Sequence, residues 1–240
     1  MTSPEIASPR CPITGEPAVR LVQWVKRSFL EKLWRYMFKV DARRELAGVE
    51  RFGLWESPIG LCFFDPPIEG SHEFYTRFYS SFRLFQDWSK DVSRPEFQIA
   101  ARHIAPGHRV LDVGCGFANF RHVVPQAHYT GLDPHFAEVS GIAEVRNQTL
   151  RDHLADHAGF YDAACAFQVL EHLVAPGVMF ADMLRAVRPG GLVIIGVPHH
   201  PSPYTGFPNL VLNAPPHHLT WWTERALAAL AERKIGRAHV

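Results

Sequence analysis

The sequence predicts an α/β protein with a doubly wound, mostly parallel sheet and helices on both faces. Three observations favour this fold class. Residues 109–113 are a mainly apolar run that includes Asp112, and two glycines, Gly114 and Gly116, follow it. This pattern is typical of a buried parallel strand followed by a tight turn beneath a ligand. Short β-rich runs then alternate with helical stretches. An acidic residue, Asp133, ends the second of these runs, about twenty residues after the turn.

The composition is that of an ordinary soluble protein. The 240 residues, 47% of them hydrophobic, suffice for one substantial domain with an appendage. A formal net charge of +1 gives no electrostatic reason to expect nucleic acid as a partner. The longest apolar run, near residues 192–197, is far shorter than the ~20 residues of a membrane span, so no stable membrane insertion is expected. The lack of an apolar N-terminal segment and the scattered cysteines favour a cytoplasmic location with reduced thiols.

Residues 1–91 are predicted to form an N-terminal extension that begins with a flexible lead-in. Apolar residues at helical spacing predict an amphipathic basic helix over residues 21–40, in one piece or broken in two. Such a helix either packs its apolar face against the main domain or contacts a membrane surface or an acidic partner. Two β-rich runs around residues 57–60 then predict a hairpin over residues 51–64.

A run of aromatic residues follows at spacings suited to a helix. These side chains are expected mostly to pack, while Tyr75 and Tyr79 have the alternative of lying at the mouth of a ligand site, where aromatic faces favour a cationic group. The aromatic residues are Phe74, Tyr75, Phe78, Tyr79, Phe82, Phe85 and Trp88.

The sheet itself is predicted within residues 92–200. A helix over residues 94–103 leads through a Pro-Gly turn into the first strand, and residues 201–234 are expected to form a loop and a helix on the acceptor side. Either Thr220 or Thr223 is expected to cap that last helix. The strands are expected at residues 109–113, 129–133, 144–147, 161–169 and 192–197, with a further helix over residues 177–187.

The residues that end the strands indicate the ligand, because ligands bind such sheets beyond the carboxyl ends of the strands. Asp133 is placed to accept hydrogen bonds from ribose hydroxyls, which implies an adenosine-containing ligand. A nicotinamide or flavin dinucleotide is disfavoured, because its glycine pattern needs a third glycine where this chain has Asn119. Asp112 suits a ligand with a positive group better than a pyrophosphate, which a carboxylate repels.

Four motifs stand in order along residues 92–200 and carry a family resemblance. They are Asp112-Val-Gly-Cys-Gly-Phe-Ala118, Gly131-Leu-Asp133, Phe167-Gln-Val-Leu-Glu-His-Leu173 and Leu184-Arg-Ala-Val-Arg-Pro-Gly-Gly191. Together they resemble the class I S-adenosylmethionine-dependent methyltransferases, which have a Rossmann-like fold. Within that class they are similar to the small-molecule, type 11/23-like branch, whose members carry a Val-Leu-Glu-His signature after strand four.

The resemblance implies S-adenosyl-L-methionine as the cofactor. In that family the glycine turn holds the methionine part, the acidic residue that ends strand two binds the ribose, and residues after strand three contact the adenine. Carried over by position, the implied cofactor-binding residues are Asp112, Gly114, Cys115, Gly116, Asp133, Pro134, Asn147, Gln148 and Gln168.

Histidines are the candidate catalytic residues. Methyl transfer is an in-line displacement at a sulfonium methyl, so the protein mainly aligns the reactants and excludes water. A base helps if the acceptor is a hydroxyl or an amine, and His172, just past strand four, is the first candidate. His217 and His218, after strand five, are candidates for acceptor contacts or for the base. No metal is predicted, because adjacent histidines rarely point at one ion and no carboxylate partner is evident.

The sequence therefore predicts an enzyme that transfers a methyl group to a small-molecule or lipid-like acceptor. The alternative from another class is a catalytically inactive module that binds S-adenosylmethionine. A dinucleotide-dependent oxidoreductase is a third possibility, which Asn119 disfavours. The acceptor, its reacting atom and the oligomeric state are left open.

The C-terminus is expected to lack part of the sheet. The family's sheet normally continues with an antiparallel strand pair, for which there is no room after the predicted last helix. Residues 235–240 look like the translation of a sequencing-adapter oligonucleotide and are expected to be a non-biological tail. We therefore expect the natural protein to continue after about Arg233, and the loss of the strand pair to expose the edge of strand five.

Overall fold

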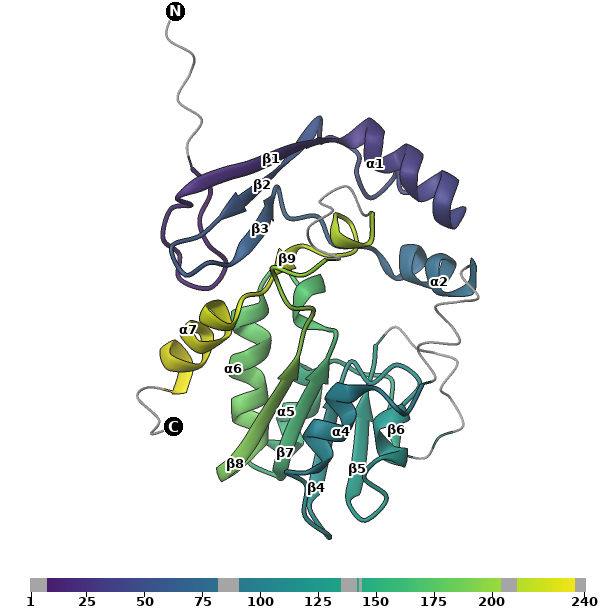
Figure 1. The fold of residues 1–240 in the computed structure, drawn as a ribbon. Helices are drawn as coiled ribbons and strands as arrows, with labels where there is room; N and C mark the ends of the chain where they lie inside the picture. Colours follow the sequence, from purple (N-terminus) through teal and green to yellow (C-terminus); the bar gives the residue numbers. More distant parts are fainter. Residues whose placement is uncertain (1–7, 82–90, 135–141, 143, 204–210, 236–240) are drawn as a thin grey trace, which may run out of the picture. The chain divides into compact units, whose positions relative to one another are not determined.

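A computed structural model describes residues 8–81, 91–134, 142, 144–203 and 211–235 of the chain. The chain forms two compact units. One, which we call the parallel unit, comprises residues 72–170 and 178–197. The other, the antiparallel unit, comprises residues 1–71, 171–177 and 198–240. Each unit has its own sheet, and Figure 1 labels the elements of both.

The parallel unit contains a five-stranded sheet in the order β6-β5-β4-β7-β8, and every pair of neighbours is parallel. The chain enters at the central strand β4, moves outward to β6, and then crosses back to β7 and β8. This reversal of direction beside β4 is the arrangement of a doubly wound sheet, and it confirms the predicted fold class. The strands are β4 (Arg109–Val113), β5 (His128–Leu132), β6 (Val145–Arg146), β7 (Tyr161–Phe167) and β8 (Val187–Gly196).

Helices cover both faces of this sheet. In Figure 1, α4 lies in front of the strands, and α5 and α6 lie behind them. Local signals set two of the helix starts: Pro95 occupies the first turn of α4, and the Thr149 hydroxyl accepts a hydrogen bond from the Asp152 N–H at the start of α5. The helices and short 3₁₀ turns are α2 (His72–Ser81), α4 (Pro95–Ala101), η2 (Asn119–His122), α5 (Leu150–His157), η4 (Leu170–His172) and α6 (Pro176–Ala186).

The predicted aromatic helix is present as α2, in which Phe74, Tyr75 and Phe78 are buried. Their burial agrees with the expectation that this run mostly packs. Phe82, Phe85 and Trp88 lie outside the described residues, as does the side chain of Tyr79.

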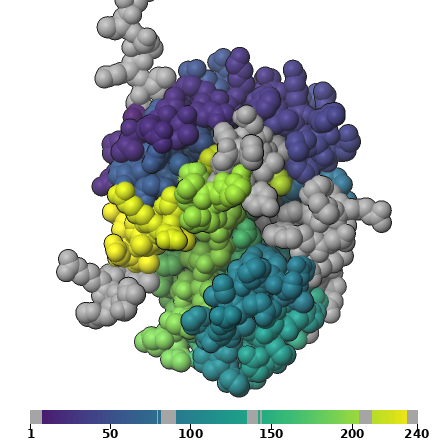
Figure 2. All heavy atoms as spheres, in the orientation of Figure 1, coloured from purple at the N-terminus to yellow at the C-terminus, as the bar shows by residue number. Residues whose placement is uncertain are grey.

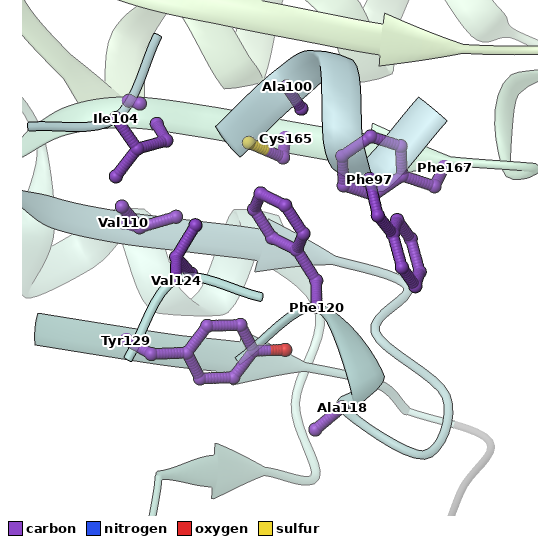
Figure 3. Close-up of a cluster of buried hydrophobic side chains, with 11 residues drawn as sticks. Phe97, Ala100, Ile104, Val110, Ala118, Phe120, Val124, Tyr129, Cys165 and Phe167 are labelled. Atoms are coloured by element: carbon purple, nitrogen blue, oxygen red, sulfur yellow. The ribbon is translucent and has the colours of Figure 1, made fainter. Parts of the chain in front are cut away.

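Three phenylalanines form the centre of the core on the α4 side of the sheet (Figure 3). Phe97 comes from α4, Phe120 from η2 and Phe167 from the end of β7. The ring centroids of Phe97 and Phe120 lie 5.4 Å apart, and each lies 4.9 Å from that of Phe167. Because tilted and edge-on rings at this separation attract each other beyond the burial of their area, this trio fixes α4 and η2 against β7.

A carboxylate ties together the amino ends of three strands. Asp162 on β7 accepts hydrogen bonds from the Arg109 N–H of β4, at 2.7 Å, and from Arg188 Nε of β8, at 2.6 Å. These bonds hold the pKa of Asp162 down, at about 2. Residues 188–191 loop out of β8, since Val187 pairs with Tyr161 and Leu192 with Ala163. Residues Arg188-Pro-Gly-Gly191 therefore form a bulge within a strand that begins earlier than the predicted residue 192.

The antiparallel unit contains a four-stranded sheet in the order β1-β2-β3-β9. Strands β2 and β3 are the predicted hairpin. After β9 the chain forms α7, whose first turn is capped by the Thr223 hydroxyl, which accepts the Ala226 N–H at 3.1 Å. The elements are β1 (Arg20–Lys26), β2 (Arg51–Glu56), β3 (Cys62–Asp65), the 3₁₀ turn η5 (Val211–Asn213), β9 (Thr220–Trp221) and α7 (Glu224–Ile235).

The prediction of a helix over residues 21–40 is wrong for residues 21–26. Residues 20–26 form strand β1, and only then does the chain turn into α1 (Arg27–Leu33) and the π-helical turn η1 (Trp34–Phe38). Val22, Trp24 and Val25 are residue types that favour strands, and pairing with β2 outweighs the helical spacing. The side chains of Phe29 and Tyr36 are 40% and 79% exposed, and α1 lies at the surface in Figure 2.

None of the helices that the structure describes combines the length and the apolar character that crossing a membrane requires.

We predict that Phe97→Ala destabilises the parallel unit by about 3–5 kcal/mol, because it removes one ring of the phenylalanine trio and leaves a cavity. Ile99→Ala in the same helix is the matched control, since Ile99 is 56% exposed and its loss should change stability by less than about 0.5 kcal/mol. Urea unfolding followed by circular dichroism measures both. Equal effects of the two substitutions would contradict the assignment of this core.

Candidate functional site

The turn after β4 has a backbone that only glycine adopts easily. Gly114 and Gly116 have φ values of +69° and +51°. The N–H groups of Gly114 and Cys115 both donate to the Leu132 carbonyl at the end of β5, at 2.8 and 3.1 Å. A Cβ built on Gly114 would lie 2.6 Å from Val169 Cγ2, so a side chain does not fit there. Glycine is therefore required at residue 114 both by conformation and by space.

Asp133 joins this turn, as the spacing of the sequence predicted. It follows β5 directly, is 7% exposed, and accepts the Gly116 N–H on Oδ2 at 2.9 Å. The interaction orients the carboxylate at the carboxyl edge of the sheet, beside the reversal in strand order. Two of the predicted cofactor-binding features, the glycine turn and the acidic residue after strand two, therefore meet in one place.

Asp112 is buried beneath the turn. Its Oδ2 accepts a hydrogen bond from the Tyr129 hydroxyl at 2.6 Å, and only 3% of the residue is exposed. Burial raises the pKa of Asp112 to about 7, against the smaller opposing effect of the Tyr129 hydrogen bond. A direct contact of this carboxylate with the cofactor stays a prediction. The sequence reasoning missed Tyr129, which nothing in the strand pattern distinguishes from an ordinary core residue.

Cys115 packs inside the same turn. A Cβ built on Gly131 would lie 2.7 Å from Cys115 Sγ, so glycine at residue 131 makes room for the thiol. Burial raises the pKa of that thiol well above its ordinary value, which keeps it protonated. Gly131 belongs to the predicted motif at strand two, and the space it leaves for Cys115 is a role the sequence did not reveal.

The other predicted cofactor residues follow neighbouring strands. Pro134 comes after Asp133 and is exposed, and Asn147 is exposed after β6. Gln148 contacts the ring of His153 through its amide. Gln168, after β7, has a φ of +58° and its N–H donates to the Gly196 carbonyl at 2.7 Å. These residues follow the carboxyl ends of neighbouring strands, and the hydrogen bond from the Gly116 N–H joins the glycine turn to Asp133.

The parallel unit fits S-adenosylmethionine better than a phosphate-bearing ligand. The turn has no side chain at Gly114 or Gly116, and it presents an oriented carboxylate, Asp133, suited to a pair of ribose hydroxyls. Two carboxyl groups, Asp112 and Asp133, lie at this turn, and burial makes Asp112 the harder of the two to ionise, with a pKa raised to about 7. A carboxylate there favours a cationic sulfonium and repels phosphate.

The three predicted catalytic histidines form a cluster in the antiparallel unit, and we call His172, His217 and His218 the histidine cluster. The ring centroid of His172 lies 4.5 Å from that of His217 and 4.7 Å from that of His218, and the last two are 4.5 Å apart. His172 ends η4, whereas His217 and His218 precede β9. Residues 45 positions apart in the sequence are thus brought into contact.

Hydrogen bonds to backbone carbonyls orient two of the rings. His172 Nδ1 lies 2.8 Å from the His217 carbonyl oxygen, and His217 Nδ1 lies 2.9 Å from the Leu212 carbonyl oxygen. Because a carbonyl oxygen only accepts, both Nδ1 atoms carry the proton and donate it. In the neutral rings, the lone pair therefore lies on Nε2.

Burial keeps the histidine cluster neutral at pH 7. It lowers the pKa of His172 to about 4 and moves the pKa values of His217 and His218 well below the ordinary value. A general base works best with a pKa near the operating pH, so these rings are weak bases. The predicted role of the three histidines as base or acceptor contacts stays a prediction.

Neighbouring elements hold the cluster in place. The Leu219 N–H donates to the Glu171 carbonyl at 2.7 Å, and the Phe64 N–H of β3 donates to the Leu219 carbonyl at 2.9 Å. Trp34 donates its indole N–H to the Pro215 carbonyl at 3.3 Å, with its ring 6.0 Å from that of His217. The sequence reasoning gave no role to Trp34, which it counted with the amphipathic helix.

Comparison with known proteins identifies the family. The family model described as "Methyltransferase domain" matches residues 79–234, well over half of the chain. The ubiquinone biosynthesis O-methyltransferase of Escherichia coli O7:K1 is 35% identical over 97 residues, which cover 35% of this chain and 40% of that protein. The enzyme of the same name from Xanthomonas campestris pv. campestris B100 is 30% identical over 109 residues, covering 40% and 46%. The chain thus spans less than half the length of the curated relatives it matches.

Solved structures agree on the fold. A SAM-dependent methyltransferase from Archaeoglobus fulgidus superposes with a TM-score of 0.53 at 18% identity, over 67% of this chain and 73% of that one. The Burkholderia thailandensis 1,6-didemethyltoxoflavin-N1-methyltransferase gives 0.52 at 22% identity, over 72% and 83%. These likenesses confirm the Rossmann-like fold, and the family match confirms the resemblance and the family's cofactor, S-adenosylmethionine. The chain belongs to the methyltransferase-domain family of the class I S-adenosylmethionine-dependent methyltransferases.

Proposed function

We propose that this protein transfers the methyl group of S-adenosylmethionine to a small-molecule acceptor. The observation that carries the proposal is the hydrogen bond from the Gly116 N–H to the Asp133 carboxylate, which joins the glycine turn to an oriented acceptor of hydrogen bonds from ribose hydroxyls. Relatives named as ubiquinone biosynthesis O-methyltransferases support a small or lipid-like acceptor. The near-neutral charge of the chain, +1, gives no support to a nucleic-acid acceptor.

In this mechanism the protein binds and orients. The cofactor, when bound, supplies an electrophilic methyl group on a sulfonium, so no covalent nucleophile of the protein is needed. Asp133 binds the ribose, Gly114 and Gly116 admit the methionine part close to the backbone, and the negative potential of Asp112 and Asp133 favours the positive end of the ligand. Alignment of donor and acceptor then accounts for the rate.

The experiment that tests the function is calorimetry with S-adenosylmethionine, followed by incubation with a panel of small phenolic, amine and lipid-like acceptors. Products are analysed by mass spectrometry for the gain of one CH₂ unit. Binding together with a methylated product supports the enzyme. Binding without any product across the panel favours the alternative, an inactive cofactor-binding module, and absence of binding contradicts both.

We predict that Asp133→Ala weakens S-adenosylmethionine binding about 10–100-fold, because it removes charge-assisted hydrogen bonds to the ribose and the carboxylate that the Gly116 N–H contacts. Asp162→Ala is the matched control. Asp162 is also a hydrogen-bonded carboxylate at a strand end of the same sheet, but it contacts Arg109 and Arg188 at the amino end. Its loss should lower stability and leave the affinity within about threefold of wild type.

We predict that Gly114→Ala abolishes measurable cofactor binding, because the new Cβ meets Val169 Cγ2 and φ is +69°. Gly107→Ala separates the two causes, since Gly107 has a φ of +79° but no atom within 4 Å of the point that its new Cβ would occupy. That control should cost only the backbone strain, about 1–2 kcal/mol in thermal unfolding, and keep wild-type affinity. Equal loss of affinity in both variants would show that backbone strain alone is responsible.

We predict that Asp112→Asn flattens the dependence of stability on pH. The pKa of Asp112 is raised to about 7 in the folded protein, so between about pH 4 and pH 7 the folded state binds more protons than the unfolded state. Stability therefore falls as pH rises through this window, by at most about 1.4 kcal/mol per pH unit from this group. Asparagine cannot titrate but still accepts the Tyr129 hydrogen bond. Unfolding midpoints at pH 5, 6, 7 and 8 measure the difference, and parallel curves for the two proteins would refute it.

A further inference from the structure

We propose that His172, His217 and His218, together with Glu171, bind a divalent first-row transition-metal ion, for which zinc is the best match. All four residues belong to the antiparallel unit. The site is distinct from the predicted cofactor turn, so it stands or falls independently of the proposed methyl transfer.

The geometry of the cluster is close to that of a metal site. One ring nitrogen from each histidine can be chosen so that all three lie within 4.8 Å of one another. A tetrahedral zinc ion with Zn–N bonds of about 2.0–2.1 Å needs its ligand atoms about 3.4 Å apart. Glu171 Oε1 lies 3.8 Å from His172 Nε2 and 4.0 Å from His218 Nε2. Shifts of about an ångström, within the reach of side-chain rotation, would bring the four groups to bonding distance of one ion.

The hydrogen bonds of the rings are those of metal ligands. A histidine that binds a metal through one nitrogen usually donates the other N–H to a carbonyl or carboxylate, which fixes the tautomer and the ring orientation. His172 and His217 both donate Nδ1–H to backbone carbonyls, at 2.8 and 2.9 Å. Their Nε2 lone pairs are thereby set to face away from those carbonyls, and His172 Nε2 is the atom that approaches Glu171.

The charges of the site favour a cation. Glu171 is 0% exposed, and a buried carboxylate is stabilised by positive charge close to it. Neutral imidazole, the form of histidine that binds metals, carries no positive charge of its own. A divalent ion among the rings would supply it.

The donor set selects the class of ion. Imidazole nitrogens suit zinc, copper, iron and nickel, whereas magnesium and calcium prefer oxygen ligands. Three nitrogens and one carboxylate oxygen, in a compact arrangement, match zinc most closely. The side chains of His172 and His218 are 17% and 12% exposed, which leaves the ion a route from solvent.

The folded chain supplies both features that the sequence pattern was expected to lack for a metal site. Adjacent histidines were expected to point apart, but the rings of His217 and His218 are stacked 19° from parallel with centroids 4.5 Å apart. The carboxylate that the loop lacked is Glu171, supplied by the segment after β7.

The test measures metal directly. The full-length chain, purified without chelator, is dialysed and its metal content determined by plasma mass spectrometry, and Zn²⁺ affinity is measured by competition with a chromogenic chelator. We expect about one ion per chain, a rise of the unfolding midpoint on adding Zn²⁺, and, after replacement by Co²⁺, the intense visible absorption of tetrahedral cobalt.

Variants locate the ion. His172→Asn and His218→Asn should each weaken Zn²⁺ binding more than about a hundredfold, and Glu171→Gln about 10–100-fold. His200→Asn is the control, because His200 is a partly buried histidine of the same unit that lies beside Cys62, outside the cluster. It should keep wild-type affinity.

The proposal is overturned if the wild-type chain retains no ion and shows neither a Zn²⁺-dependent midpoint nor a Co²⁺ spectrum. It is also overturned if His200→Asn loses Zn²⁺ as much as the cluster variants do. Should a cluster variant fail to fold, the wild-type measurements alone decide, since none of them depends on a substitution or on methyl transfer.

Discussion

Three backbone N–H groups bind the turn after β4 to the end of β5, and the site of the parallel unit depends on them. Gly114 and Cys115 donate to the Leu132 carbonyl, and Gly116 donates to Asp133. These bonds form only because the turn takes up a left-handed backbone, which glycine allows at residues 114 and 116. Because glycine has no side chain, nothing at residues 114 and 116 stands between the backbone of the turn and a ligand. The turn also holds the carboxylate of Asp133 in place before any ligand binds. Such preorganisation lowers the entropy that binding would otherwise lose.

The same region contains a buried ionisable group, which lowers the stability of the fold. Asp112 lies beneath the turn with 3% of its surface exposed, and its burial opposes ionisation, while the Tyr129 hydroxyl partly offsets that effect. A core residue chosen for stability alone would be apolar. When it is ionised, a carboxyl group here places negative potential close to the glycine turn, where it would stabilise a cationic ligand. If Asp112 has the predicted role in binding the cofactor, its burial is stability given up for ligand preference.

Much of the fold follows from the sequence, because strand and turn signals are local. The strand over residues 109–113 is found at those residues, and the alternation of strand and helix correctly predicted a doubly wound parallel sheet. Residues 21–26 were predicted as helix but form part of β1, because pairing with β2, which is not local, overrides their helical spacing. The meeting of Gly116 and Asp133 was predictable, since both follow adjacent parallel strands. The histidine cluster was not: it requires the chain before β9 to return beside η4 through the Leu219–Glu171 hydrogen bond, which no pattern in the sequence encodes.

The chain that leaves β7 runs from the predicted cofactor-binding residues to the proposed metal ligands. Gln168 ends the strand with a left-handed φ of +58°, and Glu171 and His172 follow within the next turn. A metal bound by Glu171 and His172 would also restrain this short segment, because two of its residues would be fixed to His217 and His218, far along the chain. A bound metal ion would thereby restrain the backbone immediately after Val169, whose side chain faces Gly114. A metal site in one unit and a cofactor turn in the other would then be linked through one short stretch of covalent chain, without any contact between the units being required.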